Sequence, residues 1–417
     1  MLSKLKKSPS KGPKSRPFTF IDLFAGCGGL SEGFYRKGFK ALAHVEINKF
    51  ACETLRKRME YYGYRDANDA VVEYDITAPD ILNKIDAVVR DVKVDIIIGG
   101  PPCQAYSTAG RARDPHGMEN DPRNFLFESY VKVLEHYRPK FFVFENVTGL
   151  LSANVHGKQI LSEVFAALER NYKILRDPER IVLNAVNYGV PQIRRRVIIF
   201  GVRKDLETSP EALYDGVVKT HYSPEEENVR PKNLLKKYVT VRDAISELPP
   251  LHQGEGLWEV PFDYSAGNEF LKRVGAKRRG VLRDHVCRKH NPTDVERYSE
   301  MSRHHWTFPE LLENRPDLRH EKARLFDNSY VVQFWDSPSR TIIAHLVKDG
   351  NQFIHPDPNQ GRTITVREAA RLQSFPDDFE FSGSRGEKFR QIGNAVPPLF
   401  AEALACSMLK ALRRSSK

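Results

Sequence analysis

The stretch FTFIDLFAGCGGL, residues 18–30, carries the strongest indication of the fold. Its first half is rich in aromatic and aliphatic residues, which is typical of a strand buried on both faces of a sheet. Its second half holds Gly26, Gly28 and Gly29. Glycines at this place let the backbone approach a ligand at a helix N-terminus. The stretch therefore predicts a strand, a loop and a helix; a tight turn without a ligand is the alternative.

The same alternation continues to about residue 203. Further runs typical of buried strands cover residues 41–45, 94–98, 140–144 and 197–202, and a helical spacing of apolar residues covers 124–137. Strands alternating with helices predict an α/β fold with a doubly wound, mostly parallel sheet. In such sheets, ligands bind at the carboxyl ends of the strands.

Between residues 204 and 328 this rhythm gives way to Pro, Gly and charged clusters, which indicates a smaller, inserted domain. Helical patterns return at 365–374 and 398–412. We expect a basic tail at 1–17, a large domain at 18–203 completed by 385–417, and the inserted domain with its hinge at 204–384.

Composition narrows the class of protein. The chain has 417 residues, 40% of them hydrophobic, and a formal net charge of +11, which favours a polyanionic partner. The five cysteines are scattered without a CxxC pair, so neither a disulfide framework nor a metal site is expected. No apolar run approaches the roughly 20 residues of a membrane span. The tail lacks the apolar segment of a secretory signal, so the expected compartment is the cytoplasm.

The segment around Cys103 has the features of a catalytic site. Cys103 follows Gly99-Gly100-Pro101-Pro102, and the two prolines hold a thiol at the end of the strand at 94–98. A cysteine thiol is partly ionised near neutral pH and strongly nucleophilic. Glu145 ends the next strand, so its carboxyl group is expected beside the thiol, although a capping or ion-pairing role is the alternative.

Other polar residues stand where a cofactor and a substrate would bind. Glu46 ends the second strand, where an acid accepts hydrogen bonds from ribose hydroxyls, and Asp75 could take an adenine amino group. The loop is not GxGxxG, so NAD is disfavoured. Arg194 and Arg196 precede the strand at 197–202, and alternation predicts that they share one face.

These segments resemble the DNA cytosine-5 methyltransferase family over residues 18–404. Eight family motifs occur in family order: DLFAGCGG (22–29), VEIN (45–48), DIT (75–77), GGPPCQAYS (99–107), ENV (145–147), QIRRR (192–196), RTITVREAARLQSFPD (362–377) and QIGNAVPP (391–398). The departures are small: Cys27 fills a variable position, and the family has FPCQ as well as PPCQ.

The resemblance implies a Rossmann-like methyltransferase fold and an S-adenosylmethionine cofactor. It implies that Cys103 attacks C6 of a flipped-out cytosine, that Glu145 engages N3 and the amino group, and that Arg196, together with Arg194, contacts the O2 side. The cofactor residues that it implies are Phe24, Gly26, Gly28, Gly29, Glu46, Ile47, Asp75, Ile76, Pro102 and Asn394. The segment with Asn394 is expected to fold back beside the first glycine loop.

The resemblance also implies how DNA is bound. Residues 104–122 are expected to close over the flipped base, and target choice is expected in residues 204–327. A basic cluster there is expected to contact DNA: Lys272, Arg273, Lys277, Arg278, Arg279, Arg283, Arg288 and Lys289. The expected protein is a monomeric bacterial modification enzyme that acts on double-stranded DNA and produces 5-methylcytosine. A restriction endonuclease acting on the same site is a candidate partner.

Three alternative functions compete with that of a DNA cytosine-5 methyltransferase. A tRNA cytosine-5 methyltransferase of the same family would be separated by methyl incorporation into DNA and into tRNA. A catalytically inactive nucleic-acid-binding module is disfavoured by the intact Cys103 and Glu145. An NAD-dependent oxidoreductase would be separated by the cofactor bound. Zinc binding was considered for His285, Cys287, His290, His304 and His305 and disfavoured by their spacing.

Overall fold

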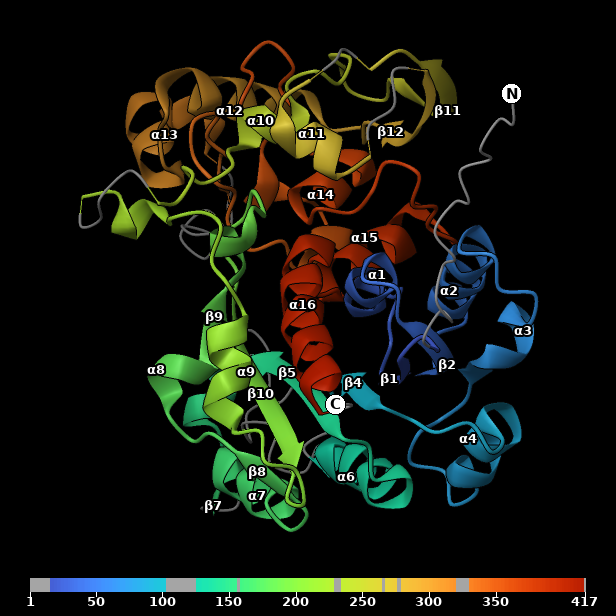
Figure 1. Cartoon of the computed structure of the whole chain (residues 1–417). Coiled ribbons are helices and arrows are strands. Elements are labelled where there is room, and N and C mark those ends of the chain that lie inside the picture. Colours follow the sequence, from blue (N-terminus) through green and yellow to red (C-terminus); the bar gives the residue numbers. More distant parts are fainter. Residues whose placement is uncertain are drawn as a thin grey trace, which may run out of the picture.

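The computed structural model describes residues 16–102, 125–155, 158–228, 234–264, 267–275, 279–319 and 330–415. Cys103, the loop at 104–122 and the basic tail up to residue 15 lie outside the described residues. The described chain forms a large lobe around a sheet and a smaller lobe above it, with α14, α15 and the start of α16 between them (Figure 1).

The sheet of the large lobe has the strand order β3-β2-β1-β4-β5-β10-β8, with β9 paired to β10. Strands β3, β2, β1, β4 and β5 are parallel, whereas β10 runs antiparallel to β5, β8 and β9. The mostly parallel α/β sheet is thus confirmed, although the strand expected at 197–202 is antiparallel. The strands are β1 (Thr19–Leu23), β2 (Lys40–Glu46), β3 (Val71–Glu73), β4 (Ile96–Gly99), β5 (Phe141–Val147), β8 (Tyr172–Ile174), β9 (Val182–Asn184) and β10 (Arg195–Arg203).

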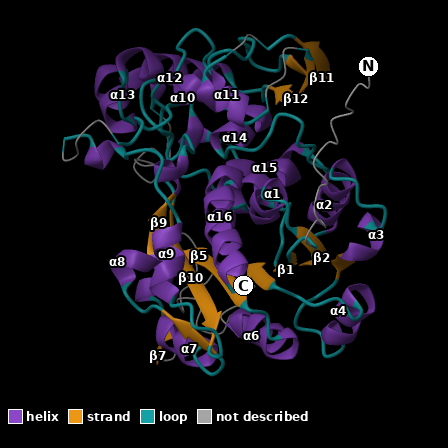
Figure 2. Ribbon diagram, viewed as in Figure 1, coloured by secondary structure: helices purple, strands orange, loops and turns teal. Residues whose placement is uncertain are grey.

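Helices cover both faces of this sheet (Figure 2). The chain steps from β1 to β2 and β3 in one direction and then returns to β4 and β5, so right-handed crossovers place α1–α3 and α4–α6 on opposite faces. The helices of this lobe are α1 (Gly29–Arg36), α2 (Lys49–Tyr61), α3 (Ala67–Ala70), α4 (Ile81–Val89), α6 (Leu126–Tyr137), α7 (Ile160–Leu168), α8 (Pro178–Ile181), α9 (Pro210–Gly216) and α16 (Pro398–Arg414). A short hairpin, β6 (Asn154–Val155) and β7 (Lys158–Gln159), precedes α7.

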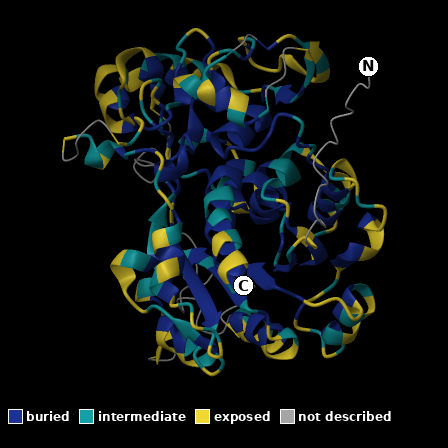
Figure 3. Ribbon diagram, viewed as in Figure 1, coloured by how far each residue is buried: buried dark blue, intermediate teal, exposed yellow. Residues whose placement is uncertain are grey.

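The central strands lie inside the core, which explains their near-continuous apolar sequence (Figure 3). All residues of β1 and β4 are buried, and Phe142 and Ile199 have no exposed surface. On β1, Asp22 is buried but accepts a hydrogen bond from the Ser31 hydroxyl. The sequence pattern and the burial therefore agree along the strands of the sheet centre.

The C-terminal helix α16 returns to the first helix. Gly33 of α1 faces the backbone of Ala401 and Glu402 so closely that a Cβ atom built on it would lie 2.3 Å from their backbone atoms. The segment Arg385–Arg414 is long and apolar enough to span a membrane, with a mean hydropathy of 1.3. However, 72% of its most apolar window is buried inside the protein. It therefore serves as a core element of the large lobe.

The smaller lobe has a core of its own. Met301, Phe308, Leu311 and Ile354 are fully buried in a second apolar cluster, where Phe308 stacks on Tyr330. Proline and capping residues start its helices, since Asn291 caps α12 and Thr307 forms a capping box with Glu310 of α13. Its elements and those of the hinge are α10 (Val241–Ile245), β11 (Gly256–Phe262), α11 (Glu269–Arg273), β12 (Gly280–Val286), α12 (Pro292–His304), α13 (Phe308–Asn314), the 3-10 helix η8 (Ala344–Val347), α14 (Val366–Leu372) and α15 (Arg385–Asn394).

The first residues of the segment expected to form the inserted domain, from residue 204, pack on the large lobe. Helix α9 packs on β10 and on α16, and Tyr214 donates a hydrogen bond to the Ile198 carbonyl of the sheet. Leu213 and Tyr214 are buried there, so the large lobe extends to about Val217. The connection between β10 and α9 is short and polar, so no sequence pattern indicated that α9 packs on the large lobe.

Gly33→Ala should destabilise the protein because the added methyl group meets backbone atoms that cannot rotate away. We expect a loss of about 3 kcal/mol in the free energy of unfolding, measured by denaturant titration. Gly38→Ala is the control. Gly38 has a φ of +78° and open space around it, so only backbone strain of about 1–2 kcal/mol is expected. Equal losses in the two variants would contradict the close α1–α16 contact.

Candidate active site

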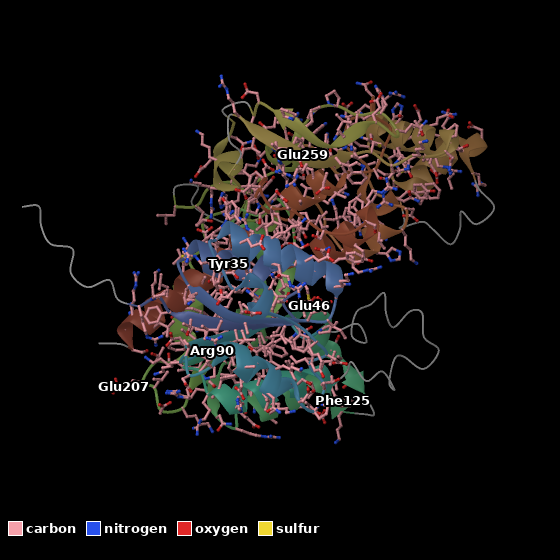
Figure 4. The ribbon with its side chains drawn as sticks, turned by 90° about the vertical axis from the view of Figure 1, so that its right-hand side faces the viewer. Tyr35, Glu46, Arg90, Phe125, Glu207 and Glu259 are labelled. Carbon is pink, nitrogen blue, oxygen red and sulfur yellow. The ribbon has the colours of Figure 1, made fainter. Side chains whose placement is uncertain are left out.

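The parallel strands bring the predicted polar residues to one edge of the sheet. Phe24 and Gly100 directly follow β1 and β4, Glu46 is the last residue of β2, and Glu145 lies two residues before the end of β5. Register pairs join Leu23 to Val45 and to Gly99, and Gly99 to Phe144, so these ends are adjacent. Figure 4 labels Glu46 at this edge of the large lobe. The edge is where a doubly wound sheet binds its ligands.

The glycine loop after β1 has an unusual backbone conformation. Phe24 has a φ of 57°, which is unfavourable for a residue with a side chain, and Gly26 and Gly28 also have positive φ values. A Cβ atom on Gly26 would meet nothing within 4 Å, whereas one on Gly29 would lie 2.4 Å from the Val396 carbonyl oxygen. The loop is therefore open beside Gly26 and tightly packed at Gly29.

This packing brings the C-terminal motif to the first loop, as the sequence predicted. Ala395 and Val396 contact Gly29, and Asn394, the preceding residue, is exposed at the end of α15. Thr54 Oγ1 donates to the Gln391 side chain, which ties α15 to α2 as well. Segments nearly the whole chain apart thus form one surface.

The Glu46 carboxylate organises the edge. Its Oε2 accepts a hydrogen bond of 2.8 Å from the Gly26 amide, and its Oε1 accepts from the amides of Ile47 and Asn48 at 3.0 and 2.8 Å. Glu46 was expected to accept ribose hydroxyls. The structure shows that it also fixes the glycine loop to the end of β2, with one lone pair of Oε2 left for a ligand.

The remaining expected cofactor residues frame an accessible surface. Ile47 is 67% exposed, which is unusual for a large apolar side chain, and Asp75 and Pro102 are also exposed, whereas Ile76 is buried. Asp75 Oδ1 accepts hydrogen bonds from the backbone and hydroxyl of Thr77, which orients the carboxylate. An apolar platform beside two carboxylates fits an adenosine group, so the residues present suit the expected cofactor.

Glu145 lies against the segment that leads to Cys103. A Cβ atom on Gly100 would be 2.6 Å from Glu145 Oε2, so a larger residue here would displace the Glu145 carboxylate from its position. The next residue, Asn146, donates a side-chain hydrogen bond to the Pro101 carbonyl at 3.2 Å. The end of β5 is therefore fastened to Gly100 and Pro101, while Cys103 itself lies outside the described residues.

Arg196 holds the Glu145 carboxylate. Its Nε lies 3.0 Å from Glu145 Oε1, and both side chains are largely buried. Burial lowers the pKa of Arg196, and the charge of Glu145 opposes this shift. A desolvated ion pair has a fixed geometry, and a carboxylate held in this way can face a substrate from a defined direction.

Arg194 is buried like Arg196, but it contacts different groups. Its guanidinium donates hydrogen bonds to the carbonyls of Ile342, Gly393 and Ala395 at 2.7, 3.1 and 2.9 Å. Burial and the nearby charge of Arg196 lower its pKa. Arg194 therefore fixes the α15–α16 connection, and its expected contact with the base stays a prediction.

Two buried glutamines, for which the sequence predicted no individual role, complete this connection. Gln192 donates to the Leu372 carbonyl and to Gln373 Oε1, and it accepts from the Ile342 amide. Gln373 donates to the carbonyls of Ile392 and Ala395. A sequence feature that could have indicated their role is a polar residue within an apolar run, because a buried amide side chain needs hydrogen-bond partners.

The expected basic cluster is not one surface. Arg273 lies near Glu402 of α16, Arg283 pairs with Glu259 and Glu380, and Arg288 is 7% exposed. Lys277 and Arg278 lie outside the described residues. Arg273 on α11 is thus separate from Arg283 and Arg288, which line one pocket beside the β11–β12 hairpin. His285 and His290 have hydrogen-bond partners in Thr365 and Thr363.

The doubly wound sheet, the glycine loop and the polar ends of β4 and β5 define an α/β methyltransferase. Residues 18–410 match the model of the C-5 cytosine-specific DNA methylase family, and the chain belongs to this family. It is a DNA cytosine-5 methyltransferase.

The relatives with curated names agree with this assignment. The chain is 34% identical to the type II methyltransferase M.Bpa9945I of Bacillus paralicheniformis, over 92% of this chain and 97% of that protein. It is 33% identical to M.DdeI of Desulfomicrobium norvegicum, over 92% and 87%. Among solved structures, a prophage-encoded protein of E. coli named as a DNA modification methyltransferase superposes with a TM-score of 0.66 at 26% identity, covering 95% of this chain and 99% of the other.

Lysine substitutions should separate the roles of Arg194 and Arg196. A lysine at 194 cannot reach three carbonyls, so Arg194→Lys should lose about 2–3 kcal/mol of unfolding free energy while the chemical step is reduced less than tenfold. Arg196→Lys should lower single-turnover methylation by about a hundredfold with a smaller loss of stability. Denaturant titration and single-turnover methylation of each variant measure both quantities. The same pattern in both variants would refute the division of roles.

Proposed function

We propose that this protein transfers a methyl group to C5 of a flipped-out cytosine in duplex DNA and that Cys103 forms a covalent bond to C6. The observation that carries the proposal is the position of Glu145. Arg196 orients its carboxylate against Gly100, three residues before Cys103 along the chain. An acid and a fixed cation thus lie at one sheet edge, and the proposed nucleophile follows that edge along the chain.

Cytosine C5 is a poor nucleophile until a group adds to C6. Attack by the Cys103 thiolate forms the Sγ–C6 bond and moves an electron pair toward N3 and C5, which makes C5 reactive. A cysteine suits this step because its pKa of about 8.5 leaves part of it ionised at neutral pH. After the methyl group joins C5, loss of the C5 proton and breaking of the Sγ–C6 bond restore the aromatic ring and the thiolate.

Glu145 and Arg196 would control charge on the base. A carboxyl group beside N3 supplies a proton as the thiolate attacks and accepts a hydrogen bond from the exocyclic amino group. The Arg196 guanidinium, which already contacts Glu145, would face the O2 side of the ring and fix its orientation. Arg194 would keep this edge in place through its carbonyl contacts.

S-adenosylmethionine supplies the methyl group as an electrophilic sulfonium when bound. Glu46 would accept a hydrogen bond from a ribose hydroxyl, Asp75 would bind the adenine amino group, and the exposed Ile47 would cover the adenine face. Phe24, Pro102 and Asn394 would border the same surface, and Gly26, Gly28 and Gly29 would let the loop approach it. Ile76, which is buried, would support it from below.

The substrate class follows from the chemistry and the family. A cytosine inside a duplex hides C5 and C6, so it must leave the stack, at a cost of a few kcal/mol. We propose that residues 104–122 close over it and that the smaller lobe reads the flanking bases. Because the relatives are type II methyltransferases, we also propose a monomeric bacterial modification enzyme that acts in the cytoplasm beside a restriction endonuclease for the same site.

Cys103→Ser should lower methyl transfer to DNA by more than about a thousandfold without changing cofactor binding, because a hydroxyl is hardly ionised at neutral pH. Cys406→Ser, on α16, is the matched control and should remain active. Wild-type protein should also become covalently trapped on DNA containing 5-fluorocytosine, whereas the Cys103 variant should not. Methylation by the Cys103 variant at more than trace level, or a preference for tRNA over DNA, would refute the proposal.

Target choice should move with the smaller lobe. Residues 218–327 contain none of the proposed catalytic or cofactor residues, and a good bidentate base contact contributes about 1–3 kcal/mol of discrimination. Replacing them with the equivalent segment of a type II relative should shift methylation to the donor's sequence, as measured by bisulfite sequencing of plasmid DNA. An active chimera that retained the original sequence preference would place specificity in the large lobe instead.

A further inference from the structure

A second polar pocket lies away from the strand ends, between the lobes. Its volume is about 840 Å³, and its walls come from α2, the β11–β12 hairpin, the end of η8 and the residues around the start of α15. None of the proposed catalytic or cofactor residues lines it. Figure 4 labels Glu259, one of its wall residues, in the upper lobe, whereas Glu46 marks the catalytic edge in the large lobe.

The charges of this pocket are unbalanced. Six of the lining residues are Lys or Arg and three are Asp or Glu. Arg283 pairs with Glu259 and Glu380, and Lys388 lies 2.5 Å from Asp284, so all three acids are paired with only two of the six cations. The other four cations have no carboxylate within ion-pairing distance in the described part of the chain: Lys57, Arg288, Lys348 and Arg385.

Arg288 is the most unusual of these four cations. It is 7% exposed, its two terminal nitrogens donate to the carbonyls of Leu346 and Lys348, and its buried Nε has no hydrogen-bond partner. Burial and the charge of Arg385 lower its pKa to about 10. A buried guanidinium without a counter-ion is costly, and an anion in the pocket would remove much of that cost.

The backbone adds further donors at the same place. Helix α15 has ten residues, and Ser384, Arg385 and Gly386 at its start line the pocket. The amides of the first helical positions have no acceptor within the helix, and the helix dipole favours an anion there. Trp258, whose side chain is 52% exposed, stands on another wall and offers an aromatic face.

We propose that this pocket binds a phosphate group, with Arg288, Arg385 and the start of α15 as its ligands and Trp258 beside the attached organic group. The phosphate comes either from the backbone of DNA outside the target bases or from a free phosphate or nucleotide. Both sources carry the same oxyanion, for which guanidinium groups and helix amides are the preferred partners. Binding of phosphate does not depend on methyl transfer and can be measured without it.

Calorimetric titration of the full-length protein with inorganic pyrophosphate tests the site. Wild-type protein should bind it, and Arg385→Gln should weaken binding by about tenfold, which corresponds to about 1.4 kcal/mol. Arg390→Gln is the matched control, because Arg390 is on the same helix but pairs with Glu387 and does not line the pocket. Arg390→Gln should leave pyrophosphate binding unchanged. Absence of binding by the wild type, or equal weakening in both variants, would overturn the proposal.

DNA binding distinguishes the two sources of phosphate. If DNA fills the pocket, pyrophosphate should compete with a duplex that extends well beyond the target, and Arg385→Gln should reduce the salt dependence of its binding by about one unit of slope. If a free phosphate or nucleotide fills it, pyrophosphate and the long duplex should bind together and the slope should stay unchanged. Both outcomes are read from the effect of Arg385→Gln on binding. The choice between the two sources of phosphate therefore does not require a measurement of methylation activity.

Discussion

The contact between the first and last helices of the large lobe determines how the catalytic edge is built. Gly33 lets α16 approach α1 at backbone distance, and Gly29, one turn earlier, does the same for the Val396 carbonyl. The C-terminal motif can reach the glycine loop only because neither glycine has a side chain that would block the approach. The glycine loop is therefore supported from behind by residues more than 360 positions away.

A second constraint comes from the direction of β10. Since β10 runs antiparallel to β5, its first residues lie beside the last residues of β5, and Arg196 pairs in register with Val147. A parallel strand in that place would have put its arginines at the opposite edge of the sheet. The antiparallel direction of β10 thus places the Arg196 guanidinium at the carboxyl ends of the parallel strands, where it forms an ion pair with Glu145. The position of QIRRR before a strand, with ENV at the end of another, reflects this geometry.

The sequence predicted the parts that depend on local pattern. Long apolar runs identified the central strands, and the glycine loop, Glu46 and Glu145 lie where strand ends were expected. Strands β3, β8 and β9 were missed because three residues are too few to show a period. The carbonyl contacts of Arg194 were missed because they join segments about 150 and 200 residues apart, and nothing in QIRRR distinguishes a buried guanidinium from one facing a base. The role of Arg194 therefore depends on tertiary contacts that the sequence pattern does not reveal.

The same limit explains why the basic cluster of the smaller lobe could not be assigned from composition. Arg283 and Arg288 are close in sequence, yet Arg283 pairs with two acids and Arg288 is buried without a carboxylate partner among the described residues. Helix α15 then connects this second arginine to the catalytic edge. Arg288 holds the end of η8, η8 packs against Gly393, and the Gly393 carbonyl is held by Arg194. With a rise of 1.5 Å per residue, the two ends of α15 are about 14 Å apart. The helix therefore has its positive end at the pocket and its exposed Asn394 at the other end, near the glycine loop, so a shift of α15 would move both ends together.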